Sequence, residues 1–259
     1  MSTILRERHD HVLLITFNRE DKLNAFDPDM IAELADAYTE LAEDKTLRCG
    51  VIAARGRFFT SGLDLMAVAP RMMPGAEPLI AVGKIDPWGV NTPPCPKPIV
   101  SAVQGRCFTL GIELMLAAQI NVAAEGASFC QAEVSRGILP FGGGSVRWAQ
   151  AVGAQNAYRY LLTGDNFDAA EALRMGLVQQ VVAAEQCLET AMTLAQRVAT
   201  QAPLAVQATL RNARLAQDQG PAAAFAKLHP ELLALMSSQD ARIGMEAFML
   251  RKPAEFIGE

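Results

Sequence analysis

The sequence lacks the residues and spacings that would mark a metal centre or a disulfide-bonded domain. Its 259 residues include three histidines, and no two cysteines are separated by two residues. His9 and His11 share one strand face, but only His229 is left as a further histidine, so we interpret the pair as ordinary side chains. The cysteines are odd in number and scattered, which favours reduced thiols in a cytoplasmic protein. They are Cys49, Cys95, Cys107, Cys130 and Cys187.

Long apolar runs and an excess of positive charge are also missing. No uncharged stretch reaches the roughly 18 apolar residues that a membrane span needs. Arg6, Glu7 and Arg8 stand where a signal peptide has its apolar core. A net charge of −5 argues against a general nucleic-acid binder, although a local basic patch for a phosphorylated small molecule is compatible with it. We therefore expect no nucleic-acid partner and no membrane partner.

Several well-known catalytic and nucleotide-binding loops are absent as well. The sequence has neither a Gly-x-Gly-x-x-Gly fingerprint nor a P-loop. The stretch 141–147 is rich in glycine, but Arg147 occupies the position where a nucleophile elbow needs its last glycine. These absences exclude the simplest nucleotide-binding and serine-hydrolase interpretations.

What the sequence does have is an apolar content of 51%, enough to bury a sizeable core. Asp27 and Pro28 are a typical N-cap and first residue of a helix. The pattern predicts an α/β fold, with an α/β core over residues 1–200 and a helical region over residues 201–259. Apolar, β-branched runs predict strands at 11–17, 49–54, 99–103, 120–124 and 178–182. Further helices are expected at 110–118, 146–152, 155–162, 168–175, 184–200, 204–217, 222–235 and 240–250.

Two glutamates, Glu113 and Glu133, are the strongest candidates for chemistry. Glu113 precedes the apolar run 114–118, and Glu133 precedes the Pro- and Gly-rich stretch 140–144. A carboxylate among apolar neighbours loses solvation, so its pKa rises toward the range useful for proton transfer. Two such groups can act as general acid and general base on one substrate or one water. Each also has a purely structural explanation: Glu113 suits a first helical turn, and Glu133 suits a solvated position after a strand.

Both glutamates stand within segments that together resemble the crotonase family, whose best-known members are enoyl-coenzyme A hydratases. Each segment is weak alone, but their order and spacing make the resemblance strong and extend it essentially from end to end. The segments are Asn18–Phe26, Phe59–Leu65, Val103–Ala118, Ala132–Gly144, Leu162–Gly164, Ala170–Val182 and Gly244–Pro253. The resemblance implies a crotonase-like spiral of ββα turns with a C-terminal helical region that forms trimers, commonly stacked as hexamers.

The resemblance also assigns roles to particular residues. It implies an oxyanion hole made by the backbone N–H groups of Leu63 and Leu110, the second at a helix start three residues before Glu113. Such donors stabilise the charge that a thioester oxygen gains when the alpha carbon becomes enolate-like. Lys22 either meets a phosphate of coenzyme A or is a solvated loop lysine. The substrate and coenzyme A contacts that the resemblance implies are Lys22, Leu23, Asn24, Ser61, Gly62, Asp64, Leu65 and Gly111.

The sequence departs from the usual hydratase pattern at three places. Thr109-Leu110-Gly111 stands where Gly-Gly-Gly is commoner, so the Leu110 side chain must point away from the thioester. Ala132 stands where a proline often precedes the second glutamate, so Glu133 is less rigidly oriented. The segment 66–97 is unusually long and proline-rich, which is typical of a functional loop. Its apolar residues either line an acyl pocket or pack beneath the loop; they are Met66, Met72, Met73, Ile80, Ile85 and Trp88.

The function that the resemblance implies is hydration of a trans-2-enoyl-CoA to the 3-hydroxyacyl-CoA, with Glu113 and Glu133 sharing the water. Two alternatives stay open: an enoyl-CoA isomerase that shifts the double bond, and a non-catalytic member that binds acyl-CoA. The glutamate pair, together with Gly62 and Gly111, favours an enzyme. No metal or redox cofactor is implied, because coenzyme A arrives as part of the substrate. The expected partners are an acyl-CoA thioester and further copies of this chain in a homotrimer or hexamer.

Overall fold

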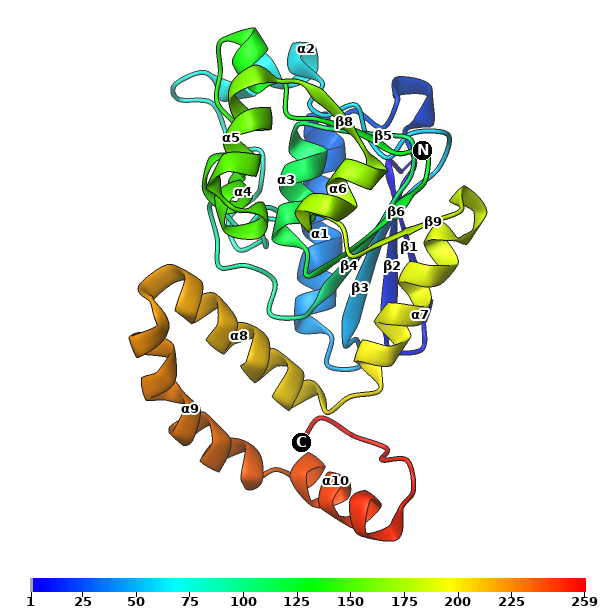
Figure 1. The fold of residues 1–259 in the computed structure, drawn as a ribbon, viewed down its shortest axis with the longest axis vertical. Helices are drawn as coiled ribbons and strands as arrows, with labels where there is room; N and C mark the ends of the chain where they lie inside the picture. Colours follow the sequence, from blue (N-terminus) through cyan, green and yellow to red (C-terminus); the bar gives the residue numbers. More distant parts are fainter. Residues whose placement is uncertain (1) are drawn as a thin grey trace.

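The computed structural model describes residues 2–259 and builds the core of the protein from two sheets (Figure 1). The larger sheet has the strand order β1-β2-β3-β4-β6-β9, in which only β1 runs antiparallel to its neighbour. The smaller sheet has the order β5-β7-β8. The strands are β1 (Ile4–His9), β2 (Val12–Phe17), β3 (Cys49–Ala54), β4 (Ile99–Val103), β5 (Arg106–Phe108), β6 (Ile120–Ala124), β7 (Ser128–Cys130), β8 (Asn166–Asp168) and β9 (Gln180–Val182).

Helices cover both faces of the larger sheet and then leave it at the C-terminal end. They are α1 (Pro28–Glu43), α2 (Leu65–Val68), α3 (Leu110–Ala117), α4 (Gly144–Val152), α5 (Ala154–Thr163), α6 (Ala169–Met175), α7 (Cys187–Ala199), α8 (Pro203–Gln219), α9 (Pro221–Met236) and α10 (Gln239–Leu250). The short 3-10 turns are η1 (Glu20–Lys22), η2 (Ala69–Met72), η3 (Glu133–Arg136) and η4 (Ala184–Gln186).

The predicted strands are largely confirmed. Those at 49–54, 99–103 and 120–124 have the predicted bounds, and β2 begins one residue later than expected. The strand predicted at 178–182 was too long. The N–H of Val178 bonds to Ala172 and that of Gln179 to Asn121, so β9 begins at Gln180.

The predicted helices are present, with ends that move by one or two residues. Asp27 is the N-cap of α1, and its side chain accepts a hydrogen bond from the Met30 N–H at 2.9 Å. The helix predicted at 184–200 is instead a 3-10 turn, η4, followed by α7. The strands β1, β5 and β8 were not predicted, and the short strand expected before Glu133 was given no bounds; it is β7.

The chain passes repeatedly from the larger sheet to the smaller one. Strand β4 leads to β5, and β6 leads to β7, so each turn adds one strand to each sheet. The same register continues beyond the strands, because Thr60 bridges Cys107, which pairs with Phe129. Parallel strands end at one edge of a sheet. The segments that follow Thr60, β5 and β7 therefore emerge side by side.

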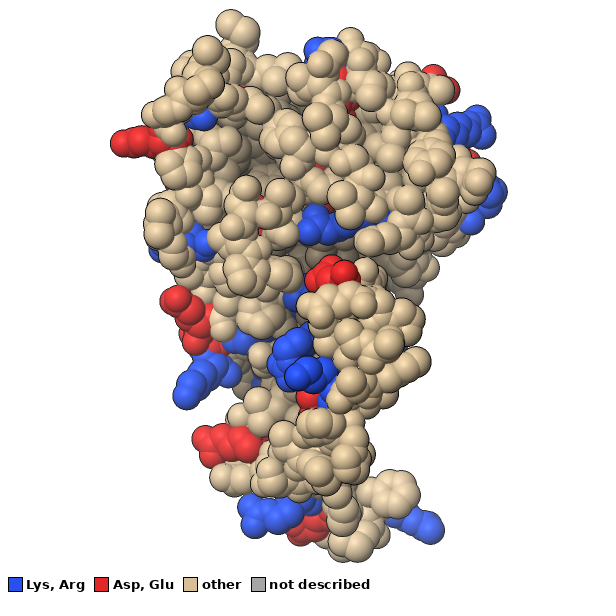
Figure 2. All heavy atoms as spheres, turned by 90° about the vertical axis from the view of Figure 1, so that its left-hand side faces the viewer, with Lys and Arg blue, Asp and Glu red and all other residues tan. Residues whose placement is uncertain are grey.

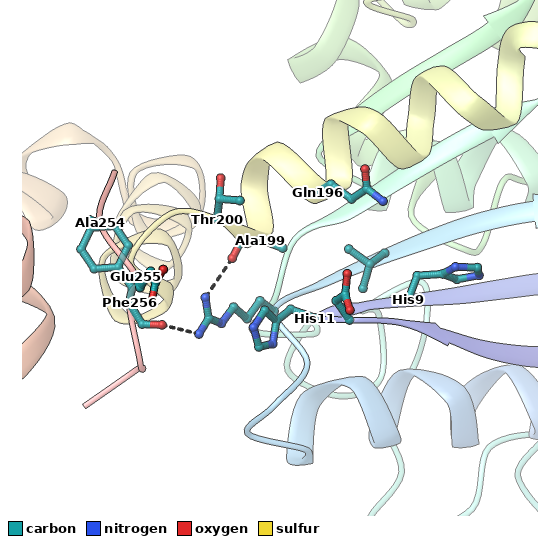
Figure 3. Close-up of a pocket in the computed structure, with 11 residues that line it drawn as sticks. His9, His11, Gln196, Ala199, Thr200, Ala254, Glu255 and Phe256 are labelled. Carbon is teal, nitrogen blue, oxygen red and sulfur yellow. Dashed lines mark hydrogen bonds between the residues drawn. The ribbon is translucent and has the colours of Figure 1, made fainter. Parts of the chain in front are cut away.

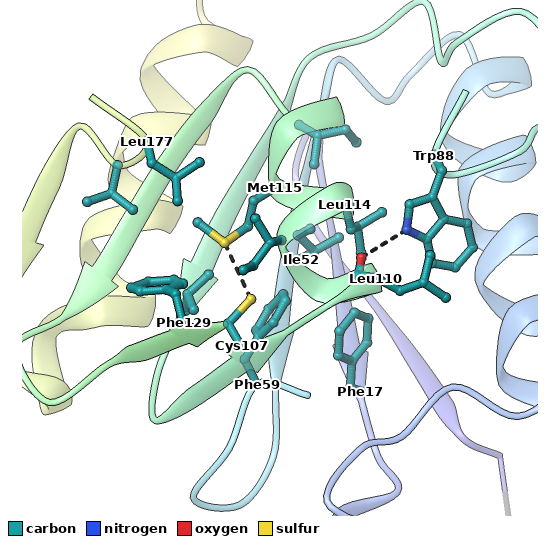
Figure 4. Packing of buried hydrophobic residues seen from close by; sticks show 14 of the residues in the cluster. Phe17, Ile52, Phe59, Trp88, Cys107, Leu110, Leu114, Met115, Phe129 and Leu177 are labelled. Carbon is teal, nitrogen blue, oxygen red and sulfur yellow. Dashed lines mark hydrogen bonds between the residues drawn. The ribbon is translucent and has the colours of Figure 1, made fainter. Parts of the chain in front are cut away.

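Two apolar clusters hold the layers together. On one face of the larger sheet, α7 packs through small residues such as Ala191 and Ala195. On the other face lies the main cluster, which includes the aromatic side chains of Phe17, Phe59 and Phe129 beneath α3 (Figure 4). Burying each large side chain contributes about 1.5–3 kcal/mol. The five cysteines are buried free thiols.

The three last helices extend away from the core (Figure 1). Helices α8 and α9 pack on each other, joined by the ion pair Arg211–Glu231 at 3.2 Å. Arg214 of α8 donates a hydrogen bond of 2.7 Å to the Cys95 carbonyl and so ties α8 to the core. Within residues 2–259, no helix has the length and apolar character needed to cross a membrane.

Candidate active site

The two candidate glutamates follow neighbouring strands of the smaller sheet. Glu113 lies in the first turn of α3, which follows β5. Glu133 begins η3, which follows β7. Because β5 and β7 are parallel and in register, the turns that follow them lie next to each other. Burial is the main cause that raises the pKa of Glu113, and the charge of Glu133 raises it further.

Glu113 is fully buried and is held by one oxygen. Its Oε1 accepts a hydrogen bond of 2.7 Å from the Gly144 N–H, at the start of α4. Its Oε2 has no hydrogen-bond partner within the described residues. Burial raises the pKa of Glu113 to about 7, and the Gly144 N–H opposes this shift only in part. A buried acceptor without a partner is costly, so Oε2 is available to a water or a substrate.

Glu133 is held in the same way from another direction. Its side chain is 4% exposed, and its Oε1 accepts a hydrogen bond of 3.0 Å from Nε2 of Gln131. Its Oε2 also lacks a partner in the part of the chain that the structure describes. Burial raises the pKa of Glu133, while its own backbone N–H and Gln131 lower it. The two carboxyl groups therefore each keep one oxygen fixed and one free.

Glycines at the start of α4 make room for Glu113. A Cβ on Gly142 would lie 3.0 Å from Oε2 of Glu113 and 2.7 Å from Cδ2 of Leu110. A Cβ on Gly144 would lie 2.9 Å from Oε1 of Glu113 and 2.8 Å from Cβ of Pro140. The glycine-rich stretch that lacks a nucleophile elbow thus serves to let α4 approach a carboxylate.

The two expected oxyanion donors lie on adjacent segments. Phe26 and Leu63 form a parallel bridge. The Phe26 N–H donates to the Gly62 carbonyl, and the Phe26 carbonyl accepts from the Asp64 N–H. The Leu63 N–H therefore points away from Phe26. Leu110 is the first residue of α3, and its N–H has no acceptor within the helix. The Leu110 carbonyl accepts a hydrogen bond of 3.0 Å from the Trp88 indole, which fixes the peptide (Figure 4).

Close packing between Gly62 and Thr109 brings these segments together. A Cβ on Gly62 would collide with Oγ1 of Thr109, and Gly62 has a φ of 95°. Thr109 itself has φ 51° and ψ −116°, a conformation that costs a β-branched residue about 1–3 kcal/mol. Leu110 is 4% exposed, and its side chain packs beside Gly142.

The loop expected to meet coenzyme A is shaped by its own buried groups. Leu23 and Asn24 have φ values of 55° and 51°, and Lys22 is exposed. The Asn24 amide is buried and bonds to the Arg19 N–H and to the carbonyls of Arg55 and Phe58. Its side chain therefore shapes the loop. The backbone of Asn24 is engaged as well, because its N–H donates to the Arg19 carbonyl at 2.9 Å and its carbonyl accepts from the Thr60 hydroxyl at 2.6 Å.

The other expected substrate contacts surround the Leu63 segment. Ser61 is half-buried and donates its N–H to the Leu23 carbonyl at 3.0 Å. Asp64 is the N-cap of α2 and forms an ion pair of 3.1 Å with Arg19, so its carboxylate supports the turn. Leu65 is exposed at the first position of α2. Gly111 packs closely against Thr60, where a side chain would not fit.

The apolar residues of the 66–97 segment differ in burial, and the acyl-pocket role stays a prediction. Trp88 is 5% exposed and packs edge-on against Phe26, while Ile80 and Ile85 rest on the main cluster. Met66 and Met73 are 89% and 65% exposed and lie free of the core. Ile80, Ile85 and Trp88 thus pack beneath the loop, whereas Met66 and Met73 are open to solvent.

Two of the hollows on the surface differ in how they relate to the expected site residues. One, of about 520 Å³, lies between the 87–95 loop, α3, α4 and α8, and Trp88, Gly143 and Arg147 line it. The side of the molecule that carries α4 and α5 is hollowed and largely uncharged in its upper part (Figure 2). The other, of about 590 Å³, lies beside His9, His11 and Arg48 and contains none of the expected site residues (Figure 3).

Three groups at the site were not found from the sequence. Gln131 and Trp148 are fully buried, and Gly144 supplies the N–H that holds Glu113. A local signal existed for the glycine, since 142–144 is a run of three. Gln131 and Trp148 carry no local signal, because their role depends on a contact across 17 residues of chain.

Comparison with known proteins shows the class of protein that this fold and this site define. The model of the enoyl-CoA hydratase/isomerase family matches residues 7–259. A crystal structure of a probable enoyl-CoA hydratase/isomerase from Mycobacterium abscessus is 47% identical, covers 99% of both chains and has a TM-score of 0.96. The chain therefore belongs to the enoyl-CoA hydratase/isomerase family, and the expected crotonase resemblance and fold are confirmed.

Named relatives are similar over their whole length. The 2,3-dehydroadipyl-CoA hydratase of Escherichia coli is 30% identical over 258 residues, which is 100% of both chains. The enoyl-CoA hydratase EchA19 of Mycobacterium tuberculosis is 32% identical and covers 97% of this chain and 95% of its own. Family membership makes this protein an enzyme of the crotonase type, whose relatives are named for coenzyme A thioesters.

Proposed function

We propose that this protein hydrates a trans-2-enoyl-CoA to the corresponding 3-hydroxyacyl-CoA. The observation that carries the proposal is the pair of buried carboxyl groups, Glu113 and Glu133, each with one oxygen held and one free. The names of the relatives, two of which are hydratases, support the same reaction. Free acceptor oxygens from two acids suit a single water that must be both oriented and deprotonated.

The thioester oxygen is stabilised by the backbone. Attack of the water oxygen on the beta carbon moves the electrons of the double bond toward the alpha carbon and the thioester oxygen. The N–H groups of Leu63 and Leu110 meet that oxygen, and the start of α3 adds the positive end of its dipole. The alpha carbon then takes a proton, so that one water is added across the double bond.

The two carboxyl groups divide the proton work. A pKa of about 7 lets Glu113 exist in both protonation states near neutral pH, as a group that takes and returns a proton must. The pKa of Glu133 is also raised by burial. One ionised carboxylate takes a proton from the water as the other, which starts in its acid form, delivers one to the alpha carbon. A proton then passes back to the second group before the next turnover. This chemistry needs no metal or redox cofactor, and coenzyme A enters as part of the substrate.

Turnover by acid variants tests the two-acid mechanism. We expect the enzyme to consume the absorbance of an enoyl-CoA. Glu113→Gln and Glu133→Gln should each lower kcat by at least about 100-fold, because each removes a proton-transfer group. Both variants keep the shape of the side chain and an acceptor oxygen. Unchanged turnover in both would exclude the mechanism. A panel of acyl thioesters of different length and branching would then define the substrate.

Two alternative functions predict different experimental outcomes. An isomerase would shift the double bond with one glutamate as proton shuttle, and incubation in heavy water would yield a deuterated unsaturated product instead of a hydroxylated one. A non-catalytic member would bind acyl-CoA and turn over none of the panel. The two free carboxylate oxygens favour hydration over both, because an isomerase or a binding protein has no water to place.

The Lys22 loop and the C-terminal helices carry two further parts of the proposal. Lys22 is exposed at the end of η1, where it meets a phosphate of coenzyme A. Helices α8, α9 and α10 join copies of the chain into a homotrimer or a hexamer. Support for this comes from the large apolar side chains that α9 and α10 expose, which are Phe225, Leu228, Leu232, Leu233, Met236, Met245, Phe248, Met249 and Leu250.

A further inference from the structure

The two tryptophans of the chain each donate the indole N–H to a group at the site. Trp88 donates to the Leu110 carbonyl at 3.0 Å, and Trp148 donates to Oε1 of Gln131 at 2.9 Å. Gln131 in turn donates from Nε2 to Oε1 of Glu133 at 3.0 Å. Trp148 and Gln131 are both fully buried, so water does not compete for these bonds.

The chemistry of the two neighbours fixes the orientation of the Gln131 amide. An indole N–H is a donor only, so it must face the amide oxygen of Gln131. The amide NH₂ is then left to face Glu133. The opposite orientation would put two donors together at Trp148 and two acceptors together at Glu133. Trp148 therefore determines that Glu133 always receives a donor at Oε1.

This donor has a consequence for the proton that Glu133 carries. A carboxyl oxygen that accepts an N–H bond is disfavoured as the site of the proton. The proton of the acid form must then reside on Oε2, the oxygen without a protein partner. Gln131 also lowers the pKa of Glu133 against the effect of burial. Both effects depend on the amide staying in one orientation.

We propose that Trp148 is a positioning residue that acts through Gln131 to hold Glu133, so that its free oxygen alone exchanges a proton at the site. The proposal rests on the proposed role of Glu133 in catalysis. It also explains how Glu133 is oriented although Ala132, and not a proline, precedes it. Helix α4 thereby sets both acids: Gly144 at its first residue binds Glu113, and Trp148 one turn later controls Glu133.

The test is the titration of Glu133 in the substrate-free protein. Its carboxyl infrared band is identified by its loss in Glu133→Gln and followed against pH. Trp148→Phe keeps an aromatic side chain of smaller size and removes the indole N–H, so the Gln131 amide is free to turn. We expect the midpoint to rise by about one pH unit, and kcat to fall roughly tenfold with KM changed less than about twofold.

Matched variants distinguish the effect of the hydrogen-bonded relay Trp148–Gln131–Glu133 from a general loss of packing. Trp88→Phe also removes a buried indole N–H, but at a backbone carbonyl, and should leave the Glu133 midpoint in place. In a Gln131→Leu background, Trp148→Phe should move the midpoint no further, because the relay is already broken. If Trp148→Phe does not fold, Gln131→Leu alone must raise the midpoint with Trp148 present.

Two results would overturn the proposal: an unchanged midpoint in folded Trp148→Phe, or equal and additive shifts in the two backgrounds. Because the titration needs no turnover, it stands apart from the proposed reaction. A shifted midpoint in a protein that hydrates no enoyl-CoA would support the relay and reject the hydratase.

Discussion

Burial raises the pKa of Glu113 to about 7 from an ordinary value of 4.5, so the folded protein binds this proton more tightly than the unfolded chain does. The stability that this group contributes is fully present below pH 4.5 and is lost as the pH rises through 7. The difference between the two pKa values corresponds to roughly 3 kcal/mol. Glu113 therefore lowers the free energy of unfolding at the pH where it is most useful for proton transfer.

Glu113→Gln should remove this pH dependence. The amide keeps an acceptor for the Gly144 N–H but cannot ionise, so the free energy of unfolding of the variant should exceed that of the wild type at pH 8 by up to about 3 kcal/mol. At pH 4 the two should differ little. Urea unfolding at both pH values measures the effect. A variant that is less stable than the wild type at pH 8 would contradict the raised pKa.

The residue scale also shows what the sequence allowed and what it did not. The resemblance pointed to Glu113 and Glu133, and the structure places them on adjacent turns with raised pKa values. Their partners were not predicted. Gly144 reaches Glu113 across 31 residues of chain and Trp148 reaches Gln131 across 17, so these bonds exist only once the helices are packed.

At the scale of elements, the glycines that lead into α4 control the space around Glu113. Gly142→Ala should displace Glu113, because the added Cβ would lie 3.0 Å from Oε2 and 3.1 Å from Cδ of that side chain. We expect kcat to fall by at least about tenfold while the fold persists. Steady-state kinetics with circular dichroism measures both.

The chain offers a matched glycine for comparison. Gly126, in the turn between β6 and β7, is exposed, and a Cβ there would meet nothing within 4 Å. Gly126→Ala should retain wild-type kcat. Equal losses in the two variants would show that the effect is a general one of replacing glycine and not a displacement of Glu113.

The helices and strands that could be predicted from the sequence are those whose pattern lies within their own residues. The strands 49–54, 99–103 and 120–124 are continuous apolar runs, and their bounds were predicted correctly. Strand β1 is missing from the prediction because four of its six residues are charged or histidine at an exposed sheet edge. The three-residue strands β5, β7 and β8 are held by their neighbours and have no pattern of their own.

At the scale of the whole molecule, the exposed apolar side chains of the last helices predict self-association. Phe248 and Met249 of α10 are 83% and 69% exposed. Burial of such side chains contributes about 1.5–3 kcal/mol each. Replacing both with lysine should therefore shift the protein from a trimer or hexamer toward the monomer in light scattering after size-exclusion chromatography.

An exposed leucine elsewhere provides the control for this experiment. Leu188 of α7 is 42% exposed on the core, and Leu188→Lys should leave the mass unchanged. A monomeric wild-type protein, or a lysine variant of Phe248 and Met249 with unchanged mass, would contradict the proposed role of the C-terminal helices. The division of the chain near residue 200 into core and oligomerisation region stays a prediction until then.

The guanidinium of Arg48 binds the backbone at both ends of this C-terminal region. Arg48 donates to the carbonyls of Ala199 and Phe256, at 3.0 and 2.6 Å (Figure 3). The chain that leaves the core after α7 therefore returns to Arg48 at Phe256, and the two hydrogen bonds of Arg48 close a loop. The entropy of closing such a loop grows only with the logarithm of its length. Both ends stay anchored to the same arginine, and Arg214 ties α8 to the core. We therefore expect changes of length in the connections after α8 to have little effect on the carboxyl pair.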